Sequence, residues 1–439
     1  MGKNYGLQQK SQHSNTRPLQ TSSMAMAAAT ARTILSCCRV TRICVSRLPL
    51  SWSFHRPPGG SCRPVSIIPT GWPSNLARHF SNQTTNTKTT VCTSSPQEES
   101  INSNSDPPMV TWVDDYLPTA LQPYARLSRM DKPIGTWLLL WPCYWSSAMA
   151  SNTTATSTAT SMGMLSGMPD PYLMGLFTVG AFVMRGAGCT INDFWDRDID
   201  GHVSRTAQRP LAKGELTPTQ AIGWLGLQLS VGLGVLLSLP HTYYSFCWGA
   251  ASLPLVVVYP LMKRYTHYPQ IVLGLTFNWG AWMGWAAMYG AMDFAVIAPL
   301  YLSGVAWTVV YDTIYANQDK EDDQSLGLKS TALTFGSQGD TRQKQILHGF
   351  AAVAYANWLL SGYNLLYSLE PTTTAASPTT ALGIYAVGVT GAYAHLIWQI
   401  QTAEFDNPHN LAERFRSNTK VGGIVFGSIV SSMVYTSLC

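Results

Sequence analysis

The stretch RGAGCTINDFWDRDID, residues 185–200, places four aspartates and two arginines at the end of an apolar run that begins near Pro171. A charged side chain at the middle of a bilayer costs roughly 2.5–3.5 kcal/mol on insertion scales, and somewhat less near the interface. Charges that a membrane span retains at this cost are expected to have partners or a function. The stretch therefore indicates a membrane-spanning helix that ends in a charged site.

The composition of the whole chain favours a polytopic membrane protein. The 439 residues are 46% hydrophobic and only 12% charged, with 15 Trp and 20 Tyr. The mean hydropathy of +0.03 is mild because about a quarter of the chain, the first 110 residues, is polar. Five of the nine cysteines lie in the first 97 residues and no CxxC occurs, so neither a zinc site nor a disulfide framework is predicted.

Residues 1–80 are predicted to be a mitochondrial transit peptide. No acidic residue precedes Glu98, whereas residues 1–97 carry eleven Lys or Arg among many Ser and Thr, which is a transit-peptide composition. The stretch RHFSN, 78–82, suggests cleavage after Phe80, and translation could start at Met1, Met24 or Met26. A disordered basic tail is the alternative. Residues 81–115 then form a disordered linker, and residues 116–439 form the membrane domain.

Apolar stretches near the ~20-residue length that spans a bilayer recur after residue 130. Thr- and Ser-rich loops, 151–163 and 370–380, separate some of them. We expect an all-α membrane protein of nine transmembrane helices, at 134–150, 171–192, 218–239, 242–262, 270–290, 294–315, 344–368, 380–400 and 421–438.

The basic residues of this domain are distributed on one side only. Of the seventeen Lys or Arg beyond residue 110, sixteen precede the first span or follow an even-numbered span, and only Arg185 lies inside a span. The loops of the other face carry Asp170, Asp293 and Glu370. Because positive charge marks the side from which a membrane protein is inserted, the N-terminus and the even-numbered loops are predicted to face the mitochondrial matrix.

A second acidic stretch, YDTIYANQDKEDD (311–323), follows the sixth span as NDFWDRDID (192–200) follows the second. The separation of four spans places both stretches on the same face. It suggests two parallel four-helix halves plus one further helix, with each half contributing one acidic loop.

Carboxylates repeat at helical spacing in both stretches. Asp196 and Asp200 are four residues apart, as are Asp319 and Asp323, and Asn192, Asp193 and Asp312 extend the two faces. Mg²⁺ typically takes one or two carboxylates together with phosphate oxygens, so facing clusters could hold a metal-bridged diphosphate, with Arg205, Arg209, Lys213 and Lys329 neutralising the remaining charge. The alternative is that each cluster is a solvated loop with helix caps.

Arg185 lies seven residues before Asn192 on the same helical face. It could anchor an anionic group of a substrate, either a carboxylate or the diphosphate. The structural alternatives are an arginine that extends to the membrane interface or one that pairs with an aspartate.

The two acidic stretches resemble the paired motifs of the UbiA superfamily of intramembrane prenyltransferases, NDxxDxxxD and DxxYxxxDxxxD. Three further stretches are similar to the 4-hydroxybenzoate polyprenyltransferases within it: RLSRMDKPIGTWLLLWP (126–142), SRTAQRPLAKGEL (204–216) and GLKSTALTFG (327–336). The resemblance covers about residues 115–438, and these flanking stretches are less diagnostic than the paired motifs.

The resemblance implies helices around a central, lipid-accessible cavity that the two acidic loops cap. It implies that Mg²⁺ and diphosphate bind Asn192, Asp193, Asp196, Asp200, Asp312, Asp319 and Asp323, and that Arg205, Lys263 and Lys329 contact phosphates. Tyr315 would lie near the departing group, and the residues expected to be catalytic are Asp193, Asp196, Asp319 and Tyr315.

The activity that the resemblance implies is Mg²⁺-dependent transfer of a polyprenyl group from its diphosphate to 4-hydroxybenzoate in the inner membrane, a step of ubiquinone biosynthesis. The expected partners are these substrates, the bilayer and other ubiquinone-biosynthesis proteins, and no nucleic acid. The alternatives are a UbiA relative with haem B or a naphthoate as acceptor, and a transporter with acidic ion sites. Aromatic residues of the spans could line a prenyl tunnel or pack in the core: Trp279, Trp282, Trp285 and Tyr289.

Overall fold

The computed structural model describes residues 111–151, 167–201, 206–368 and 377–438. Every regular element in these ranges is helical, and no strand occurs among them. The longer helices are α4 (Ile134–Ala150), α6 (Pro171–Asp200), α7 (Pro218–Ser238), α8 (Thr242–Val258), α10 (Pro269–Phe277), α11 (Gly280–Tyr289), α12 (Phe294–Ala316), α15 (Asp340–Ser368), α16 (Pro378–Thr402) and α18 (Asn418–Leu438). The short ones are α2 (Trp112–Tyr116), α3 (Gln122–Leu127), α9 (Met262–Tyr265), α13 (Lys320–Ser325), α14 (Thr331–Phe335) and α17 (Pro408–Arg416).

Six helical segments of the described residues are long and apolar enough to cross a membrane: Pro171–Asp200, Pro218–Ser238, Thr242–Tyr265, Phe294–Ser325, Pro378–Thr402 and Pro408–Leu438. The predicted spans 134–150, 270–290 and 344–368 are also largely helical but are not among these six. The prediction of an all-helical membrane protein is therefore confirmed. The count of nine spans and the division into two halves stay predictions.

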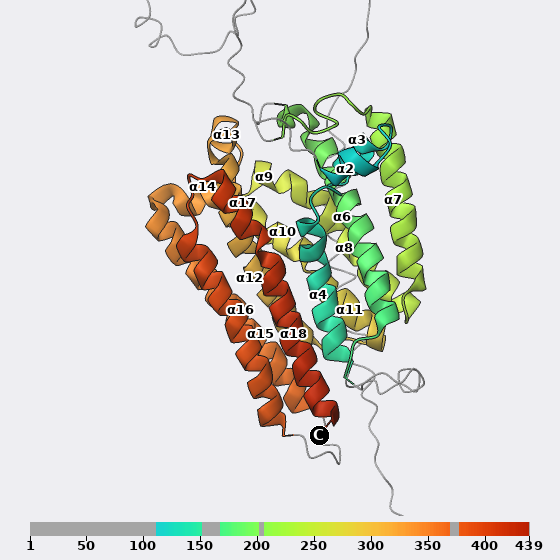
Figure 1. Cartoon of the computed structure of the whole chain (residues 1–439), viewed down its shortest axis with the longest axis vertical. Helices are drawn as coiled ribbons and strands as arrows, with labels where there is room; N and C mark the ends of the chain where they lie inside the picture. Colours follow the sequence, from blue (N-terminus) through green and yellow to red (C-terminus); the bar gives the residue numbers. More distant parts are fainter. Residues whose placement is uncertain (1–110, 152–166, 202–205, 369–376, 439) are drawn as a thin grey trace, which may run out of the picture. The chain divides into compact units, whose positions relative to one another are not determined.

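The long helices pack in a closed sequence of neighbours. α4 packs against α6, α6 against α7, α7 against α8, and α8 against α10 and α11. Contacts continue from α10 through α12, α15, α16 and α18 back to α4 (Figure 1). The short helices α3, α9, α13, α14 and α17 gather at one end of the long ones (Figure 1). The connections of the bundle at this end are therefore partly helical.

Burial differs strongly between helices and distinguishes the interior from the lipid-facing surface. Sixteen of the 23 residues of α12 are buried, whereas only Ala221 and Gln228 are buried in the 21-residue α7. The fully buried indole of Trp145 packs against Trp307 and Trp358, with ring centroids 5.3 and 6.0 Å away. A helix that is apolar on all sides is buried in a protein core or in a membrane. The burial of α12 places it in the interior of the bundle.

The predicted span 270–290 is interrupted, because α10 ends at Phe277 and α11 begins at Gly280. Asn278 occupies the break, where its Nδ2 donates to the carbonyl oxygen of Gly274 and to Oγ1 of Thr308, both at 2.9 Å. Gly304 on α12 leaves room for this side chain, since a Cβ there would lie 2.1 Å from Oδ1 of Asn278. The break is therefore built from a polar side chain and a facing glycine.

The prediction of a disordered linker over residues 81–115 is wrong for its last residues, 112–115. Residues 112–116 form α2, and the Thr111 and Asp114 side chains close a capping box at its start. Arg126 pairs with Asp114 and holds this helix against α3. Hydrogen bonds of Asp114 with the Thr111 backbone and with Arg126 lower the pKa of this carboxyl. The transit peptide, its cleavage site and Arg205 lie outside the described residues.

Candidate active site

A cavity of about 440 Å³ lies where α6 and α12 end, within the usual range of ~300–1,000 Å³ for ligand sites. It is lined by the site residues predicted from the sequence, except Arg205, which is not described, and Lys213, which pairs with Glu215 instead. Its walls carry seven aspartates and seven cationic side chains: Asp131, Asp193, Asp196, Asp200, Asp312, Asp319 and Asp323, with Arg126, Arg129, Lys132, Arg185, Arg209, Lys263 and Lys329. Formal charge is therefore balanced in a confined space.

The end of α6 directs three carboxylates into the cavity. Asp193, Asp196 and Asp200 repeat at intervals of three and four residues, which places them on one helical face. All three are buried, whereas the side chain of Asp198 on the opposite face is 86% exposed. Helical spacing, with no special loop geometry, separates the cavity-lining aspartates from the solvated one.

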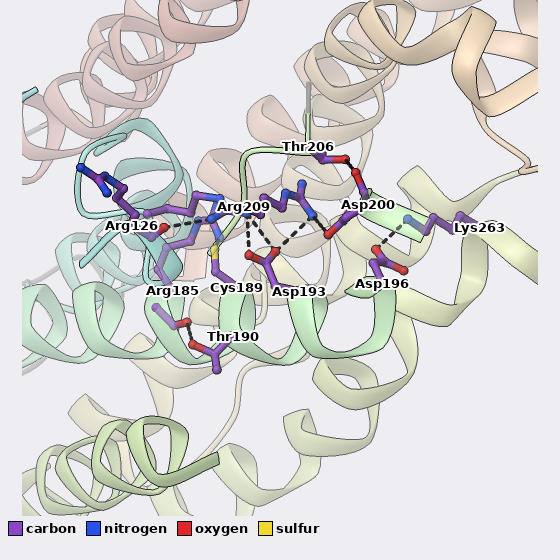
Figure 2. A network of polar contacts seen from close by, with 12 residues as sticks. Arg126, Arg185, Cys189, Thr190, Asp193, Asp196, Asp200, Thr206, Arg209 and Lys263 are labelled. Atoms are coloured by element: carbon purple, nitrogen blue, oxygen red, sulfur yellow. Dashed lines mark hydrogen bonds and ion pairs between the residues drawn. The ribbon is translucent and has the colours of Figure 1, made fainter. Parts of the chain in front are cut away.

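Arginines from two other segments neutralise two of these carboxylates. Nη2 of Arg129 donates to both carboxylate oxygens of Asp193, at 2.8 and 2.9 Å. Nη1 of Arg209 lies 3.1 Å from Oδ1 of Asp193 and donates to Oδ2 of Asp200 at 2.7 Å (Figure 2). The arginines thus join the segment before α4 and the segment after α6 to the end of α6.

Asp196 faces cations from α9. Nζ of Lys263 donates to its Oδ2 at 2.6 Å (Figure 2). Nη2 of Arg264 lies 3.5 Å from Oδ1 of Asp196 and donates instead to the carbonyl oxygen of Trp195 at 2.8 Å. Oδ1 of Asp196 is buried and has no hydrogen-bond donor within the described residues. Part of this carboxylate thus remains available to a further cation.

The second acidic stretch reaches the same cavity from the end of α12. Asp312, Asp319 and Asp323 all line it, as does Tyr315. The Tyr315 ring stacks on Phe415 of α17, with ring centroids 4.3 Å apart. The predicted convergence of the two stretches, four spans apart in the sequence, is therefore observed.

Lys329 connects the second stretch to α9. Its backbone N–H donates to the carbonyl oxygen of Lys263 at 2.8 Å, and its Nζ donates to the carbonyl oxygen of Tyr265 at 3.2 Å. The two lysines that the resemblance assigns to phosphate are thus neighbours. They lie between the acidic stretches and could both reach one bound anion.

The carboxylates do not form a ready-made metal cage. Within the described ranges, no three His, Cys, Asp or Glu side chains converge closely enough to hold a metal ion. The donor set nevertheless suits Mg²⁺, which takes one or two carboxylates and completes its shell with phosphate oxygens and water. Oδ1 atoms of Asp131 and Asp196 are buried without a hydrogen-bond partner among the described residues. The residues present therefore fit a metal that arrives with a phosphate.

Arg185 lies deeper in α6 and also lines the cavity. Its guanidinium contacts Sγ of Cys189 and lies 5.8 Å from the centroid of the Phe277 ring. Gly135 of α4 makes this position available, since a Cβ there would lie 2.1 Å from Nε of Arg185. That Nε is buried without a hydrogen-bond partner within the described residues. Among the described residues, Arg185 therefore does not pair with an aspartate.

Arg129 is a site residue that the sequence interpretation missed. α3 ends in a Schellman motif, in which the N–H groups of Arg129 and Met130 donate to the carbonyl oxygens of Arg126 and Ala125. Arg129 takes the left-handed position of this motif, with φ +55°, where glycine is usual. Burial alone would lower the pKa of Arg129, but the neighbouring Asp193 carboxylate raises it overall. The only sequence clue was its place in RLSRMDKP.

The four aromatic residues considered for a prenyl tunnel serve packing. None of them lines the cavity. Trp282 stacks on Trp248 with ring centroids 5.2 Å apart, and Nε1 of Trp279 donates to the carbonyl oxygen of Trp248 at 2.9 Å. Trp285 packs against Tyr289. The aromatic side chains that do line the cavity are Tyr259, Phe277, Tyr311, Tyr315 and Phe415.

The structure is a helical membrane protein with a charged cavity at one end of its bundle, and the comparison with known families assigns it to a class of intramembrane transferases. Residues 139–424 match the UbiA prenyltransferase family. The chain therefore belongs to this family. The apo structure of a UbiA homolog from Aeropyrum pernix K1 shares the fold, with a TM-score of 0.50 at 20% identity over 68% of this chain and 98% of that one.

Curated relatives with about half of their aligned residues identical carry the name mitochondrial 4-hydroxybenzoate polyprenyltransferase. The chain is 49% identical to the Aedes aegypti protein over 313 residues, which are 71% of this chain and 64% of that one. It is 47% identical to the Arabidopsis thaliana protein, over 73% of this chain and 71% of the relative. It is 48% identical to the Homo sapiens protein, over 72% and 77% respectively. The chain thus spans slightly less than two thirds of the mosquito relative and more of the other two.

Proposed function

We propose that this chain transfers an all-trans polyprenyl group from a polyprenyl diphosphate to the ring carbon ortho to the hydroxyl of 4-hydroxybenzoate, the prenylation step of ubiquinone biosynthesis. The observation that carries the proposal is the meeting of two acidic stretches and several cations around one cavity at the end of membrane helices. The identity of 47–49% to proteins named for this activity supports the choice of acceptor.

The carboxylates and the cations of the cavity have different roles in binding a diphosphate. Asp193, Asp196 and Asp319 would hold Mg²⁺, which when bound neutralises charge on the diphosphate as it departs. Lys263 and Lys329 lie beside these carboxylates and can donate to phosphate oxygens. Preorganised donors of this kind stabilise charge that develops in the transition state. Asn192, Asp200, Asp312, Asp323 and Arg205 complete the proposed binding set.

The remaining chemistry needs an acceptor held beside the allylic carbon and protected from water. Arg185, roughly 10 Å below Asn192 along α6, offers a permanent charge for the carboxylate of 4-hydroxybenzoate. Phe277 and Tyr259 provide apolar walls near it, and such walls keep water from the allylic cation. Tyr315, fixed by its stack on Phe415, faces the departing group in this proposal.

The proposal includes a membrane topology. Nine spans in two four-helix halves plus one place the acidic loops on the matrix side of the mitochondrial inner membrane. Residues 1–80 would be removed as a transit peptide, and residues 81–110 would remain as a linker. The one-sided distribution of Lys and Arg supports this orientation.

The acceptor is tested by offering several. Membranes that contain this protein are incubated with Mg²⁺, polyprenyl diphosphates of several lengths and, separately, 4-hydroxybenzoate, haem B or a dihydroxynaphthoate. We expect prenylated product, identified by mass, with 4-hydroxybenzoate alone. Product with another acceptor only would keep the family chemistry and reject the proposed substrate. Ion transport without any prenyl product would favour the transporter alternative.

A further inference from the structure

Gln228 is a buried amide on a helix that otherwise faces outward. It is 5% exposed, and Ala221 is the other buried residue of α7. A polar side chain in an apolar span is costly unless it is hydrogen-bonded. Gln228 therefore needs hydrogen-bond partners, and Ser128 and Thr190 provide them.

Gln228 belongs to a set of polar side chains that we call the Ser128 network: Ser128, Thr190, Trp224 and Gln228. Nε2 of Gln228 donates to Oγ of Ser128 at 3.0 Å, and Nε1 of Trp224 donates to the same oxygen at 2.8 Å. Oγ1 of Thr190 donates to Oε1 of Gln228 at 3.2 Å. Ser128 in turn donates to the carbonyl oxygen of Tyr124 at 2.9 Å. The network thus joins the end of α3 to α6 and α7.

Gly186 makes the close approach within this network possible. A Cβ at Gly186 would lie 2.5 Å from Nε2 of Gln228 and 3.1 Å from Cβ of Ser128. A Cβ at Gly188, two residues further along the same helix, would meet nothing within 4 Å. The two glycines are therefore a matched pair, of which only the first is required for this contact.

The Ser128 network ends next to the cavity. Ser128 directly precedes Arg129, whose φ of +55° is unfavourable for a residue other than glycine. Such a conformation persists only where its surroundings hold it in place. On one side Arg129 is tied to Asp193 through its side chain. On the other side the network fixes Ser128, which has only 4% of its surface exposed.

We propose that the Ser128 network is a positioning device for Arg129, with Gln228 as the positioning residue. It holds the backbone of Arg129 so that the guanidinium reaches the cavity at Asp193. Because Gln228 is not among the residues that line the cavity, it acts on substrate only through this arginine. The kinetic part of this inference rests on the proposed function, since it takes the anion bound near Arg129 to be the diphosphate.

Steady-state kinetics of Gln228→Leu tests the device. Leucine suits a lipid-facing helix but cannot hold Ser128. We expect the KM for polyprenyl diphosphate to rise about tenfold, equivalent to ~1.4 kcal/mol, while kcat and the KM for 4-hydroxybenzoate change less than about twofold. Ser230→Ala is the control on α7, because that hydroxyl is exposed and bonds only its own helix. Equal losses in all three constants, or no loss, would overturn the proposal.

A double-mutant cycle distinguishes action through Arg129 from a separate effect. In an Arg129→Ala background, Gln228→Leu should add less than about twofold to the KM for the diphosphate, because the residue it positions is gone. Additive effects of the two substitutions would contradict the proposed route.

Hydrogen–deuterium exchange supplies a readout that does not depend on activity. Gly186→Ala should speed exchange of residues 124–133 severalfold in the purified protein, whereas Gly188→Ala should leave it unchanged. Equal exchange in both variants would reject the network as the support of this segment. If the wild-type protein failed to prenylate 4-hydroxybenzoate, the proposed function would fail, and this comparison would still decide whether the network holds Arg129.

Discussion

Each of the three buried carboxylates at the end of α6 lies beside a cation from a different segment. Asp193 pairs with Arg129, Asp200 with Arg209, and Asp196 with Lys263. Removing one partner of a buried pair leaves an uncompensated charge, which is costly. In this structure the cations occupy carboxylate oxygens that the proposed function assigns to Mg²⁺. Binding of a metal diphosphate would thus exchange one set of ion pairs for another without leaving either charge unpaired.

The metal-binding role is tested by Asp196→Asn and Asp319→Asn. Because the two aspartates come from different acidic stretches and both line the cavity, each change should lower kcat about 10²–10³-fold, the typical effect of losing one electrostatic contact to a transition state. Asp198→Asn is the matched control, since its side chain is 86% exposed on the same helix. The measurement is prenyl transfer per folded protein in the membrane. Near-normal activity of both cavity variants would refute the metal-diphosphate site.

Arg185→Leu tests the acceptor-binding role. Loss of a desolvated charge partner typically costs about 2–5 kcal/mol, so the KM for 4-hydroxybenzoate should rise more than the KM for the diphosphate. Each substrate is varied in turn at saturation of the other. An effect confined to the diphosphate would reassign Arg185 to phosphate binding. Unchanged constants for both substrates would make it a structural residue.

The sequence predicted the cavity residues that lie within the two motifs better than the residues that support them. Helical spacing placed Asp193, Asp196 and Asp200 on one face, and the resemblance supplied Lys263. Arg129 was missed because it is 64 residues from Asp193 in the sequence, and no local pattern encodes that contact. Glycine is the usual residue at the left-handed position that ends a helix, so residue preferences do not predict this conformation for Arg129.

At the scale of elements, the interruption between α10 and α11 gives a stability prediction. Gly304→Ala places a Cβ 2.1 Å from Oδ1 of the buried Asn278. Because overpacking typically costs about 1–3 kcal/mol, we expect a lower thermal unfolding midpoint for the purified protein. Gly383→Ala on α16, where a Cβ meets nothing within 4 Å, is the control. Equal midpoints for both variants would contradict the proposed fit between α12 and the break.

The length of the apolar stretches predicted the helices but not their interruptions or their ends. The stretch 270–290 has a continuous apolar pattern, and only the tertiary bond from Asn278 to Thr308 reveals why the helix breaks. Most of α2 falls within the predicted linker 81–115, yet a capping box and the pair with Arg126 order it. The packing of Trp282 on Trp248 likewise depends on the neighbouring helix and not on spacing.

At the scale of the whole molecule, the structure agrees with the distribution of Lys and Arg on one side of the predicted spans. Asp170 and Asp293 cap the starts of α6 and α12, whereas both helices end at the cavity. The ends of these two helices thus carry the acidic stretches on one side, where the sequence also places Lys and Arg. This agreement supports the proposed matrix orientation of the cavity.

Cysteine accessibility tests that orientation. In a protein whose native cysteines are replaced, Asp170→Cys should react with a membrane-impermeant maleimide in intact mitoplasts, because its face is exposed to the medium. Lys420→Cys, exposed at the start of α18, should react only after permeabilisation. The reverse pattern would invert the proposed topology. Asn152-Thr153-Thr154, outside the described residues, matches the N-glycosylation sequence but should carry no glycan in the native protein.

We propose that the two acidic stretches form one Mg²⁺-dependent site for prenyl transfer. The most direct measurement uses the purified protein with 4-hydroxybenzoate and a polyprenyl diphosphate, and follows the product by mass spectrometry as Mg²⁺ is chelated and then restored. We expect 3-polyprenyl-4-hydroxybenzoate with Mg²⁺, none after chelation, and recovery when Mg²⁺ is returned. Undiminished product in the presence of the chelator, or no product under any condition, would refute the Mg²⁺-dependent site.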